Sequence, residues 1–425
     1  MATVSRGLPA QPHLDVPKRE ARELLDSWRA AHPDAISRIH RRHPKFKNTR
    51  DEALAAAKFR LSDAQLVVAR EYGFANWAEL KHRIESNPVA HALERAIRGG
   101  DCEQTVRLLR ENPALLHIPV RNGDWGPPMS HAANLGRLDI VQAVAALGAR
   151  DFQHAFDRAL LQGKIECARW LQGQGARIVP GIIMGSCETL NAAGLRFLAE
   201  LNAPFTDGHG DRFAPLALVL ETYCRNPEGK HEVLEIFAAQ GYLLPDTPMM
   251  AFHRGDLDRL KDHLRRDPGL IERRFAYNEI YPPEAGCKED GRLGMHGTPL
   301  DGTTLLHLAI DFYEPEIFDL LLAQGADVNA RARIDAAGFG GQTPLFNAVV
   351  SSAHACGWQR DASMTRALRD HGAAFDIRAS LRKFLDWQEE PGWHEAREVT
   401  PAEWGRGFPV QSWVNEEALR LLEKG

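Results

Sequence analysis

Residues 301–329 read DGTTLLHLAIDFYEPEIFDLLLAQGADVN, and this stretch decides the fold. Gly302 stands where a tight turn can use a positive φ without the steric cost of a Cβ atom. Thr304 is a good N-cap for a helix that begins near Leu305. Apolar residues then gather on one side of two short helices, and Gly325 closes the second one as a C-terminal glycine does. A helix pair with so large an apolar face must stack on a neighbour.

The order of these residues resembles the ankyrin repeat, whose pattern is Gly-x-Thr-Pro-Leu-His-x-Ala, a Leu-rich second helix and Gly-Ala-Asp-x-Asn. The stretch departs from that pattern at Leu305, where proline is usual. A second close copy, GGQTPLFNAV, starts at Gly341, 39 residues after Gly302. The excess over the family period of about 33 residues falls in the loop RARIDAAGFGG. Further copies, weaker after the first, lie at 126–150, 155–176, 181–206 and 214–242.

The chain also repeats itself over a longer distance. AIRGGDCEQTVRLLRENPALL at 96–116 is similar to AFHRGDLDRLKDHLRRDPGLI at 251–271, an offset of 155 residues. Both segments have a Gly-Asp turn followed by Leu-Arg-x-x-Pro-x-Leu. We therefore expect two sub-arrays, each opened by a repeat of this variant form.

These patterns predict an all-α fold: an ankyrin-type helical solenoid of about eight or nine degenerate repeats with a small N-terminal helical domain. Terminal repeats need a polar outer face, so the last segment is expected to be a capping repeat. The predicted divisions are a disordered leader (1–12), the N-terminal helical domain (13–88), a first sub-array (89–246), a second sub-array (247–378) with an insertion (277–300), and a degenerate C-terminal capping repeat (379–425).

Composition places the chain among ordinary globular proteins. Of its 425 residues, 44% are hydrophobic and 26% are charged. It has no apolar run of about 18 residues, so we expect no membrane span. The six cysteines are scattered and include no Cys-x-x-Cys pair, which favours reduced thiols. The first residues lack an apolar core of secretory type, and a cytoplasmic location is therefore expected.

The first 60 residues are basic, with 13 Lys and Arg against 7 Asp and Glu. LSDAQLVVAREYGFANWAELKHRIE at 61–85 resembles a helical segment found ahead of bacterial ankyrin arrays, which implies a bacterial protein. Ser62 and Gln65 have the spacing of a capping box. The basic cluster His40–Lys47 raises nucleic-acid binding as an alternative. However, a candidate second helix that begins Asn-Trp-Ala-Glu at Asn76 is poorly suited to reading base edges, so a nucleic-acid partner is not favoured.

The sequence has no phosphate loop, dinucleotide fingerprint, Gly-x-Ser-x-Gly elbow or paired zinc motif. His307 occupies the family's histidine position, where the ring usually bonds to the neighbouring turn, and His131 is expected to have a core or capping role. A Cys, His and Asp set that includes Cys287 could form a nucleophilic site in the insertion. However, a loop rich in polar residues contains a Cys, His and Asp set by chance. We expect no metal and no cofactor, and the sequence leans away from an enzyme without excluding one.

The resemblance implies a protein-binding scaffold that uses the concave face and finger loops, with a protein partner. Arginine beside aromatic residues is the mixture that carries interface energy. The partner-binding residues selected on that basis are Arg331, Arg333, Asp335, Phe339, Tyr277, Tyr281, His296, Arg121 and Trp125. The tryptophans Trp387, Trp393, Trp404 and Trp413 could form a recognition surface or pack a final repeat. The alternative function is an enzyme or small-molecule-binding protein with a pocket roofed by the 277–300 insertion.

Overall fold

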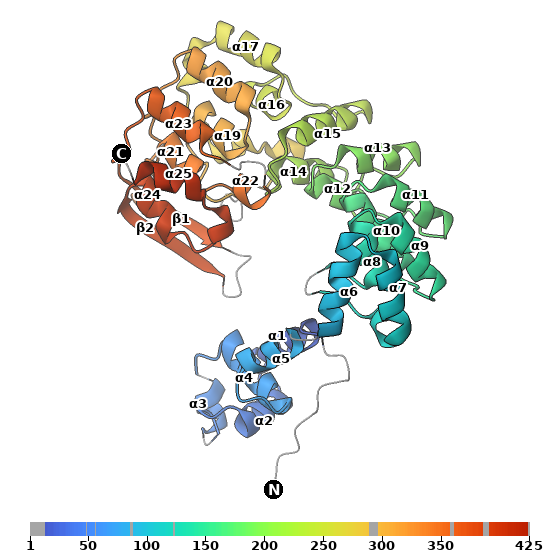
Figure 1. Ribbon diagram of the computed structural model, residues 1–425. Coiled ribbons are helices and arrows are strands. Elements are labelled where there is room, and N and C mark those ends of the chain that lie inside the picture. The colour runs from blue at the N-terminus through green and yellow to red at the C-terminus, as the bar shows by residue number, and fades with distance from the viewer. Residues whose placement is uncertain are drawn as a thin grey trace. The chain divides into compact units, whose positions relative to one another are not determined.

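The computed structural model describes residues 13–47, 49–55, 57–85, 88–121, 124–288, 296–357, 361–385 and 391–423. Its chain divides into two compact units. The first comprises Met1–Leu160 and Lys164–Arg177, and the second comprises Leu161–Gly163 and Ile178–Gly425. Both are mostly helical, as predicted (Figure 1). The predicted boundary between residues 246 and 247 separates two sub-arrays of repeats rather than two compact units. It stays a prediction.

The first unit begins with a bundle of five helices. They are α1 (Asp15–Arg29), α2 (Pro33–Arg42), α3 (Asp51–Ala55), α4 (Leu61–Glu71) and α5 (Trp77–Glu85). Their apolar faces meet in one core, which includes Leu24, Ile39, Leu54, Val67 and Leu80. The predicted capping box of α4, Ser62 with Gln65, lies two residues too far along the chain. Asp63, rather than Gln65, closes the N-terminus, because its carboxylate accepts a hydrogen bond from the N–H of Arg60 at 2.8 Å.

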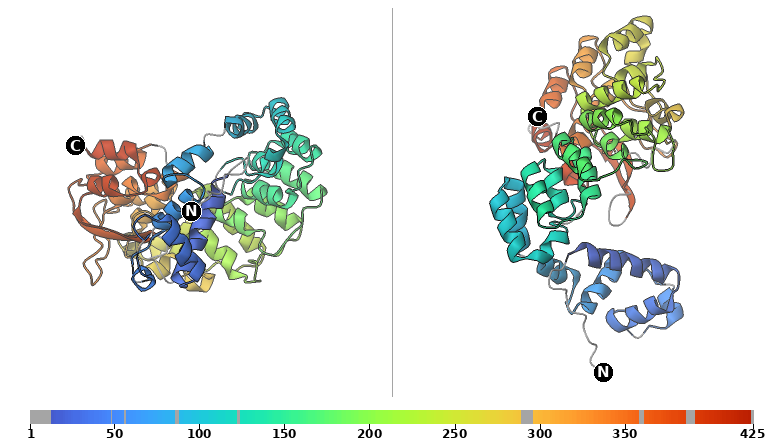
Figure 2. Two further views of the ribbon diagram at one scale, coloured as in Figure 1. Left: turned by 90° about the horizontal axis from the view of Figure 1, so that it is seen from below. Right: turned by 90° about the vertical axis from the view of Figure 1, so that its right-hand side faces the viewer.

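Helices in antiparallel pairs make up most of the rest of both units (Figure 2). The pairs of the first unit are α6 (Pro88–Gly99) with α7 (Cys102–Glu111), α8 (Pro128–Asn134) with α9 (Leu138–Ala146), and α10 (Phe152–Leu161) with α11 (Ile165–Gly173). Those of the second unit are α12 (Met184–Glu188) with α13 (Ala192–Glu200), α14 (Phe213–Glu221) with α15 (Pro227–Ala239), α16 (Pro248–His253) with α17 (Leu257–Arg266), α19 (Leu305–Asp311) with α20 (Pro315–Ala323), and α21 (Pro344–Val349) with α22 (Ser352–Ala355) and α23 (Ser363–Asp370).

The segments 96–116 and 251–271, which have similar sequences, also have similar local structures. In α7 and α17 an aspartate, Asp101 or Asp256, caps the helix by accepting a hydrogen bond from the backbone N–H three residues on. A proline then starts a 3₁₀ helix in each, η1 (Pro113–His117) and η2 (Pro268–Ile271). The long-range duplication in the sequence therefore has a structural counterpart.

Gly302 behaves as the sequence predicts, with φ of 69°. Its N–H donates to the carbonyl of Phe275 at 2.8 Å, and its own carbonyl accepts from the N–H of Arg333 at 2.9 Å. A Cβ atom at this position would lie 2.4 Å from Cβ of Arg333. Glycine is needed here both for the left-handed conformation and for the close approach of the next loop.

The first half of the insertion is compact. It contains α18 (Tyr277–Ile280) and η3 (Pro283–Ala285), and the loop returns to the array at His296. The remaining insertion residues, 289–295, lie outside the described residues.

The C-terminal segment contains the two strands of the described structure, which the all-α prediction does not foresee. Strands β1 (Ala379–Leu385) and β2 (Gly392–Val399) pair antiparallel, with Leu381 opposite Ala396 and Leu385 opposite Gly392. We refer to this pair as the C-terminal hairpin. Helices α24 (Pro401–Gly407) and α25 (Glu416–Leu422) follow, joined by η5 (Gln411–Trp413), and α24 packs on α21. The segment predicted as a degenerate repeat thus keeps a helix pair and adds a sheet before it.

Candidate functional site

The finger, residues 331–340, is held in shape by its own aspartate. Asp335 Oδ1 accepts hydrogen bonds from the N–H groups of Ala337 at 2.8 Å and Phe339 at 2.9 Å. The N–H of Asp335 donates to the carbonyl of Phe339 at 2.8 Å. Burial opposes ionisation, but these N–H donors and the Arg382 guanidinium together lower the pKa of Asp335. The finger is therefore a defined structure with a charged aspartate at its base.

Two predicted contact residues on the finger have different roles. Arg331 donates from Nε to the carbonyl of Gly341 at 3.0 Å and from Nη2 to the carbonyl of Arg378 at 2.6 Å. Its guanidinium thus ties the finger to the residue just before β1. Arg333 is exposed, and its bond to the carbonyl of Arg274 is long, at 3.5 Å. Of the two, Arg333 has the guanidinium that can turn toward a partner.

A layer of arginines and aromatic rings joins the finger to the C-terminal hairpin. The Phe339 ring is covered by Arg397 at 4.1 Å and Arg382 at 4.7 Å, and Arg382 also lies over Trp393 at 5.3 Å. Arg382 Nη2 pairs with Asp335 at 2.7 Å. The backbone continues this connection, since the N–H of Gly340 donates to the carbonyl of Ser380 at 2.6 Å. Trp393 stays 45% exposed at the edge of the layer.

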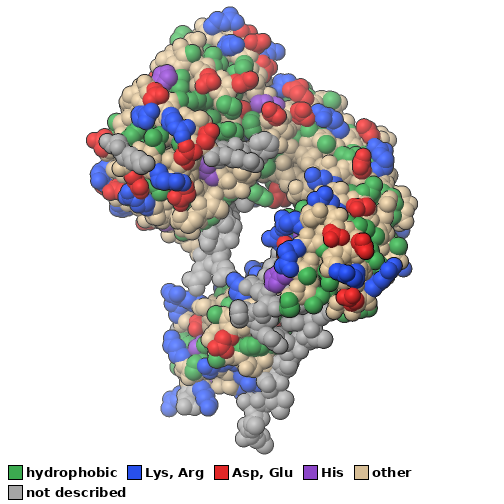
Figure 3. Space-filling model, in the orientation of Figure 1, with side chains coloured by type: hydrophobic (Ala, Val, Ile, Leu, Met, Phe, Trp, Pro, Cys, Tyr) green, Lys and Arg blue, Asp and Glu red, His purple; other side chains and the backbone are tan. Residues whose placement is uncertain are grey.

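A groove of about 180 Å³ lies between the finger and the hairpin. Four predicted site residues line it, namely His296, Arg333, Asp335 and Phe339. We call it the finger–hairpin groove; its other lining residues are Pro299, Asp301, Gly340, Gln342, Leu381, Arg382, Lys383, Phe384 and Trp393. Basic and acidic side chains are intermixed over the C-terminal elements on the face shown in Figure 3. The groove unites residues that are far apart in sequence.

The floor of the groove is buried and polar. His296 is 3% exposed and Lys383 is 2% exposed. Burial holds the pKa of His296 well below its ordinary value, and the positive charges of Lys383 and Arg225 lower it further. The imidazole is therefore neutral at physiological pH, with one ring nitrogen as donor and the other as acceptor.

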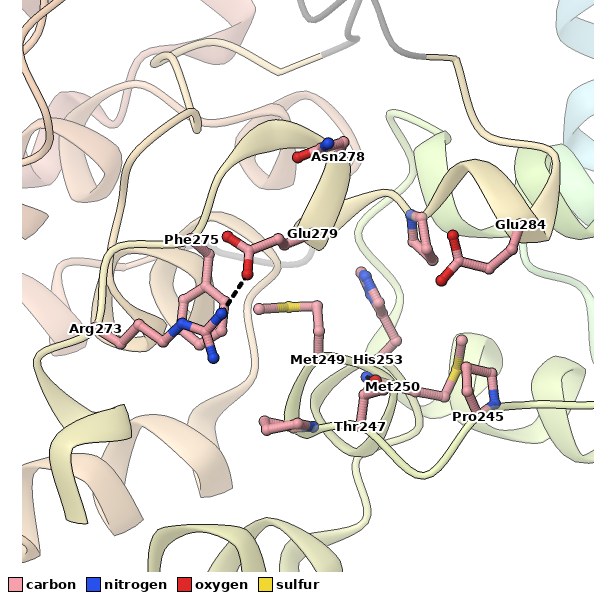
Figure 4. A pocket seen from close by; sticks show the side chains of 12 residues that line it. Pro245, Thr247, Met249, Met250, His253, Arg273, Phe275, Asn278, Glu279 and Glu284 are labelled. Carbon is pink, nitrogen blue, oxygen red and sulfur yellow. Dashed lines mark hydrogen bonds and ion pairs between the residues drawn. The ribbon is translucent and has the colours of Figure 1, made fainter. Parts of the chain in front are cut away.

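A second cavity, of about 260 Å³, lies under the start of the insertion (Figure 4). We call it the Met249 pocket. Apolar side chains dominate its walls, and Arg273 and Glu279 form an ion pair at one side. The full lining is Pro245, Thr247, Pro248, Met249, Met250, His253, Arg273, Phe275, Asn278, Glu279, Pro282 and Glu284. This arrangement is the kind of pocket that the alternative function requires.

His253, at the base of the Met249 pocket, connects it to a buried polar network. Its Nε2 lies 2.7 Å from the carbonyl of Ile280, so Nε2 carries the proton, and Nδ1 accepts from Lys230 Nζ at 2.6 Å. Burial lowers the pKa of Lys230 to about 7, although Glu314 opposes this shift. Because both ring nitrogens of His253 are engaged inside the protein, the imidazole has a structural role.

Tyr277 and Tyr281, selected as contact residues, lie in the core of the second unit instead. Tyr277 is 7% exposed and Tyr281 is 1% exposed. Their rings are 4.8 Å apart, and Tyr281 also packs against His253 and Phe312. Aromatic residues in the insertion are buried because α18 folds back onto the array, which the sequence does not reveal.

Arg121 and Trp125 belong to the first unit. Arg121 lies over the Trp125 ring at 4.6 Å, and Arg158 lies over it at 5.7 Å. Arg121 also pairs with Glu94 at 3.5 Å. These contacts brace the loop before α8 and leave the indole half-buried.

Two histidines of the basic cluster near the N-terminus, and Arg38 just before it, face carboxylates of their own bundle. Arg38 makes two 2.9 Å bonds to Glu71. His40 lies 2.8 Å from Asp51, and the buried His43 lies 3.1 Å from Asp63. Groups already facing carboxylates are less available to phosphates.

Two chemical alternatives from the sequence are a metal site and a nucleophilic Cys287. Across them, no three His, Cys, Asp or Glu side chains are placed to hold a metal ion. Burial raises the pKa of Cys287, so its thiol is protonated and a poor nucleophile. The same described ranges contain no helix with the length and apolar character needed to cross a membrane.

Comparison with known proteins supports part of this picture. The ankyrin repeat family matches residues 301–333. The chain contains an ankyrin repeat. The crystal structure of the human ASB11 ankyrin repeat domain is similar over 78% of this chain and 96% of that one, with 14% sequence identity and a TM-score of 0.20. At that TM-score the likeness adds nothing to the match at 301–333. No curated protein matches the sequence.

His307 of this ankyrin repeat has the structural role predicted for it. Its Nδ1 lies 2.9 Å from Thr304 Oγ1, and its Nε2 lies 3.1 Å from the carbonyl of Gln342. Burial lowers the pKa of His307 to about 4, which keeps the ring neutral. The histidine thus links the start of its own helix to the end of the next finger.

Sequence reasoning missed the hairpin half of the groove and the buried charges. Arg382 and Lys383 lie on β1. The sequence marks this strand only weakly, by the Pro391-Gly392 pair that follows it. Lys230 occupies α15 three, four and seven residues before the buried Val233, Leu234 and Phe237. That helical spacing could have marked it as an inward-facing lysine.

Proposed function

We propose that the chain is a protein-binding scaffold and that the finger–hairpin groove is its contact surface. The observation that carries this proposal is the layer in which Arg382 covers Phe339 and the half-exposed Trp393 beside the groove. Trp and Arg are the residues most enriched among those that dominate binding energy. An ankyrin repeat array supplies the rigid support that such a surface needs.

The six free cysteines favour a reducing compartment, which supports a cytoplasmic location. A bacterial origin rests on the resemblance of 61–85 alone.

The test uses one surface variant and one matched control. Trp393→Ala with Arg333→Ala removes two exposed groups that line the groove, and Arg420→Ala removes an exposed arginine on α25. Partners captured from host lysate by the wild-type chain are identified by mass spectrometry, purified, and titrated against all three proteins. We expect a partner whose Kd rises at least about tenfold with the groove variant and is unchanged with the control. A partner that binds all three equally contacts another surface.

A second candidate is small-molecule binding in the Met249 pocket, favoured by a cavity of about 260 Å³ with apolar walls and a few polar groups. Native mass spectrometry of the purified chain tests it directly. A bound metabolite that is lost when Met249→Trp fills the pocket would support this function. Retention of the metabolite in that variant would place it elsewhere.

A further inference from the structure

Two cysteine side chains from distant parts of the sequence meet in the second unit. Cys224 lies in the turn between α14 and α15, and Cys356 directly follows α22 (Figure 1). Cys356 Sγ lies 3.6 Å from the carbonyl oxygen of Tyr223, which is 133 residues earlier in the chain. The side chains of Cys224 and Cys356 are hydrogen-bonded to each other. Both residues are partly exposed, so a small solute has access to a pair of thiols that already touch.

The two turns that carry these cysteines are held at one point, the backbone carbonyl of Asp311. Arg225, next to Cys224, donates to this carbonyl from Nε at 3.1 Å. Ser351, the N-cap of α22, donates to it from Oγ at 3.1 Å. The turn is fixed further because the N–H of Cys224 donates to Thr222 Oγ1 at 3.2 Å. The approach of the two thiols is therefore a property of the fold rather than of one surface contact.

The two thiols differ in acidity. Cys356 Sγ accepts hydrogen bonds from the Cys224 thiol and from the N–H of Arg225, and together with the positive charge of Arg225 these lower the pKa of Cys356, although burial opposes the shift. The pKa of Cys224 is raised, because its thiol is bonded to Cys356 and because it is desolvated. Cys356 therefore ionises more readily than Cys224, and the thiolate is the form of cysteine that attacks an oxidant.

The remaining four cysteines are shifted in the opposite direction from Cys356. Burial raises the pKa of each of them, namely Cys102, Cys167, Cys187 and Cys287. A protonated thiol is a poor nucleophile and reacts slowly with oxidants. Cys356 is therefore the thiol expected to react first, and Cys102, which is also partly exposed, is a matched control.

We propose that Cys224 and Cys356 are a site of reversible oxidation, at which hydrogen peroxide converts the two thiols into a disulfide. This inference does not depend on the proposed function. The disulfide would tie the turn between α14 and α15 to the end of α22.

The reaction proceeds in two displacements. The Cys356 thiolate attacks one oxygen of the peroxide, so that an S–O bond forms, the O–O bond breaks, and the departing hydroxide takes the proton of the Cys224 thiol. The Cys224 thiolate then attacks the sulfur of the Cys356 sulfenic acid, so that the S–S bond forms and the S–O bond breaks. The second hydroxide takes from solvent the proton that Cys356 released when it ionised. Two electrons pass from the sulfur atoms to the peroxide, which leaves as two water molecules.

The first test maps the bond in the wild-type full chain. The reduced protein is freed of reductant, treated with equimolar hydrogen peroxide and blocked with N-ethylmaleimide, and its peptides are analysed by mass spectrometry without reduction. We expect a disulfide that joins the peptides of Cys224 and Cys356, is reversed by dithiothreitol, and forms at least about tenfold faster in the folded chain than in the same chain unfolded in urea. Absence of this bond, or equal rates in the folded and unfolded chains, would overturn the proposal.

Serine variants assign the two roles. In Cys224→Ser the Cys356 sulfenic acid has no second thiol to react with, so dimedone should trap it. In Cys356→Ser the rate of peroxide consumption should fall at least about tenfold. Cys102→Ser is the control and should form the disulfide at the wild-type rate. Peroxide consumption by Cys356→Ser at the wild-type rate would contradict the proposal.

A measurement on the wild-type chain covers the case in which circular dichroism shows that a serine variant does not fold. Limiting iodoacetamide at about pH 7 should alkylate Cys356 at least about tenfold faster than Cys102, because the thiolate is the reacting form. Equal rates of alkylation at the two cysteines would show that the fold does not activate Cys356, and the proposal would then be wrong.

Discussion

At the scale of single residues, the unusual feature is a set of charges buried in the second unit. Arg225 and Asp311 form an ion pair at 3.0 Å, and both are buried. Phe312 lies beneath two cations, Arg225 at 4.4 Å and Lys230 at 4.1 Å. Desolvation of such groups is expensive, and it is offset only where partners and hydrogen bonds are complete. These residues determine how stability depends on pH and on single substitutions.

Lys230→Met tests the cost of the buried ammonium. The pKa of Lys230 is lowered from 10.5 to about 7, so between those pH values the unfolded chain holds a proton that the folded chain has released. The free energy of unfolding therefore rises with pH in this window, by at most about 1.4 kcal/mol per pH unit. We expect the difference in unfolding free energy, wild type minus variant, to increase from pH 7 to pH 9 in urea titrations. With the exposed Lys261→Met, the same difference should stay flat.

Asp311→Ala should be among the most destabilising single changes, because it leaves the Arg225 guanidinium buried without its carboxylate. The expected loss is about 3–5 kcal/mol. The double variant Arg225→Met with Asp311→Leu removes both charges and should cost less than Asp311→Ala alone. Chemical denaturation of the three proteins measures both values. If the double variant is less stable than Asp311→Ala, the favourable interaction of the ion pair exceeds the cost of desolvating its two charges.

At the scale of elements, the finger and the C-terminal hairpin depend on each other. Arg331 bonds the finger to the segment before β1, and Gly340 and Ser380 share a backbone hydrogen bond. On the other face of the hairpin, His394 packs against Trp404 of α24, with ring centroids 5.1 Å apart and the rings tilted. Trp404 is fully buried, and its Nε1 donates to Thr298 Oγ1 at 3.2 Å. The hairpin is thus fixed on two sides, and this is what holds the groove in shape.

Arg331→Ala and Arg333→Ala form a matched pair on the finger. Arg331→Ala breaks two backbone contacts, and we expect a loss of about 1–3 kcal/mol in the free energy of unfolding. Arg333→Ala should stay within about 0.5 kcal/mol of wild type, since its bond to the Arg274 carbonyl is long, at 3.5 Å. Urea unfolding midpoints distinguish the two. Equal effects would mean that the finger is not held through Arg331.

At the scale of the whole molecule, the N-terminal bundle has a hydrophobic core of its own. The core runs from Leu14 to Ile84, and its partly buried members also come from within the bundle. Stacked repeats, by contrast, contact mainly their neighbours, so their stability is a sum of local terms. A destabilising substitution in the N-terminal bundle should therefore leave the stability of the repeats unchanged, and the reverse should also hold.

Leu24→Ala tests this independence. Leu24 is fully buried in α1, and its truncation should cost about 2–5 kcal/mol within the bundle. Hydrogen exchange followed by mass spectrometry should show lost protection across α1 to α5, with α19 and α20 unchanged. Leu308→Ala in α19, also fully buried, should give the reverse pattern. Loss of protection in both places from either change would mean that the chain unfolds as one body.

The sequence by itself determined the repeat. Gly302, Thr304, His307 and Gly325 have roles set by backbone conformation and by bonds to the nearest turns. Such local requirements leave a regular spacing that can be read without the fold. The same holds for the duplicated Gly-Asp and Leu-Arg-x-x-Pro segments, which adopt the same local structure.

Only the tertiary structure decided which residues share a site. The finger–hairpin groove combines His296, Gln342 and Lys383, and no local pattern links them. Arg333 and Trp393 remain exposed at the groove, whereas Tyr277 and Tyr281 are buried. Burial depends on which neighbour covers a face, and that neighbour can lie far along the chain, as β1 (Ala379–Leu385) does from His296. Residue type alone cannot tell a contact aromatic from a core aromatic, because both bury apolar surface and differ only in what covers them.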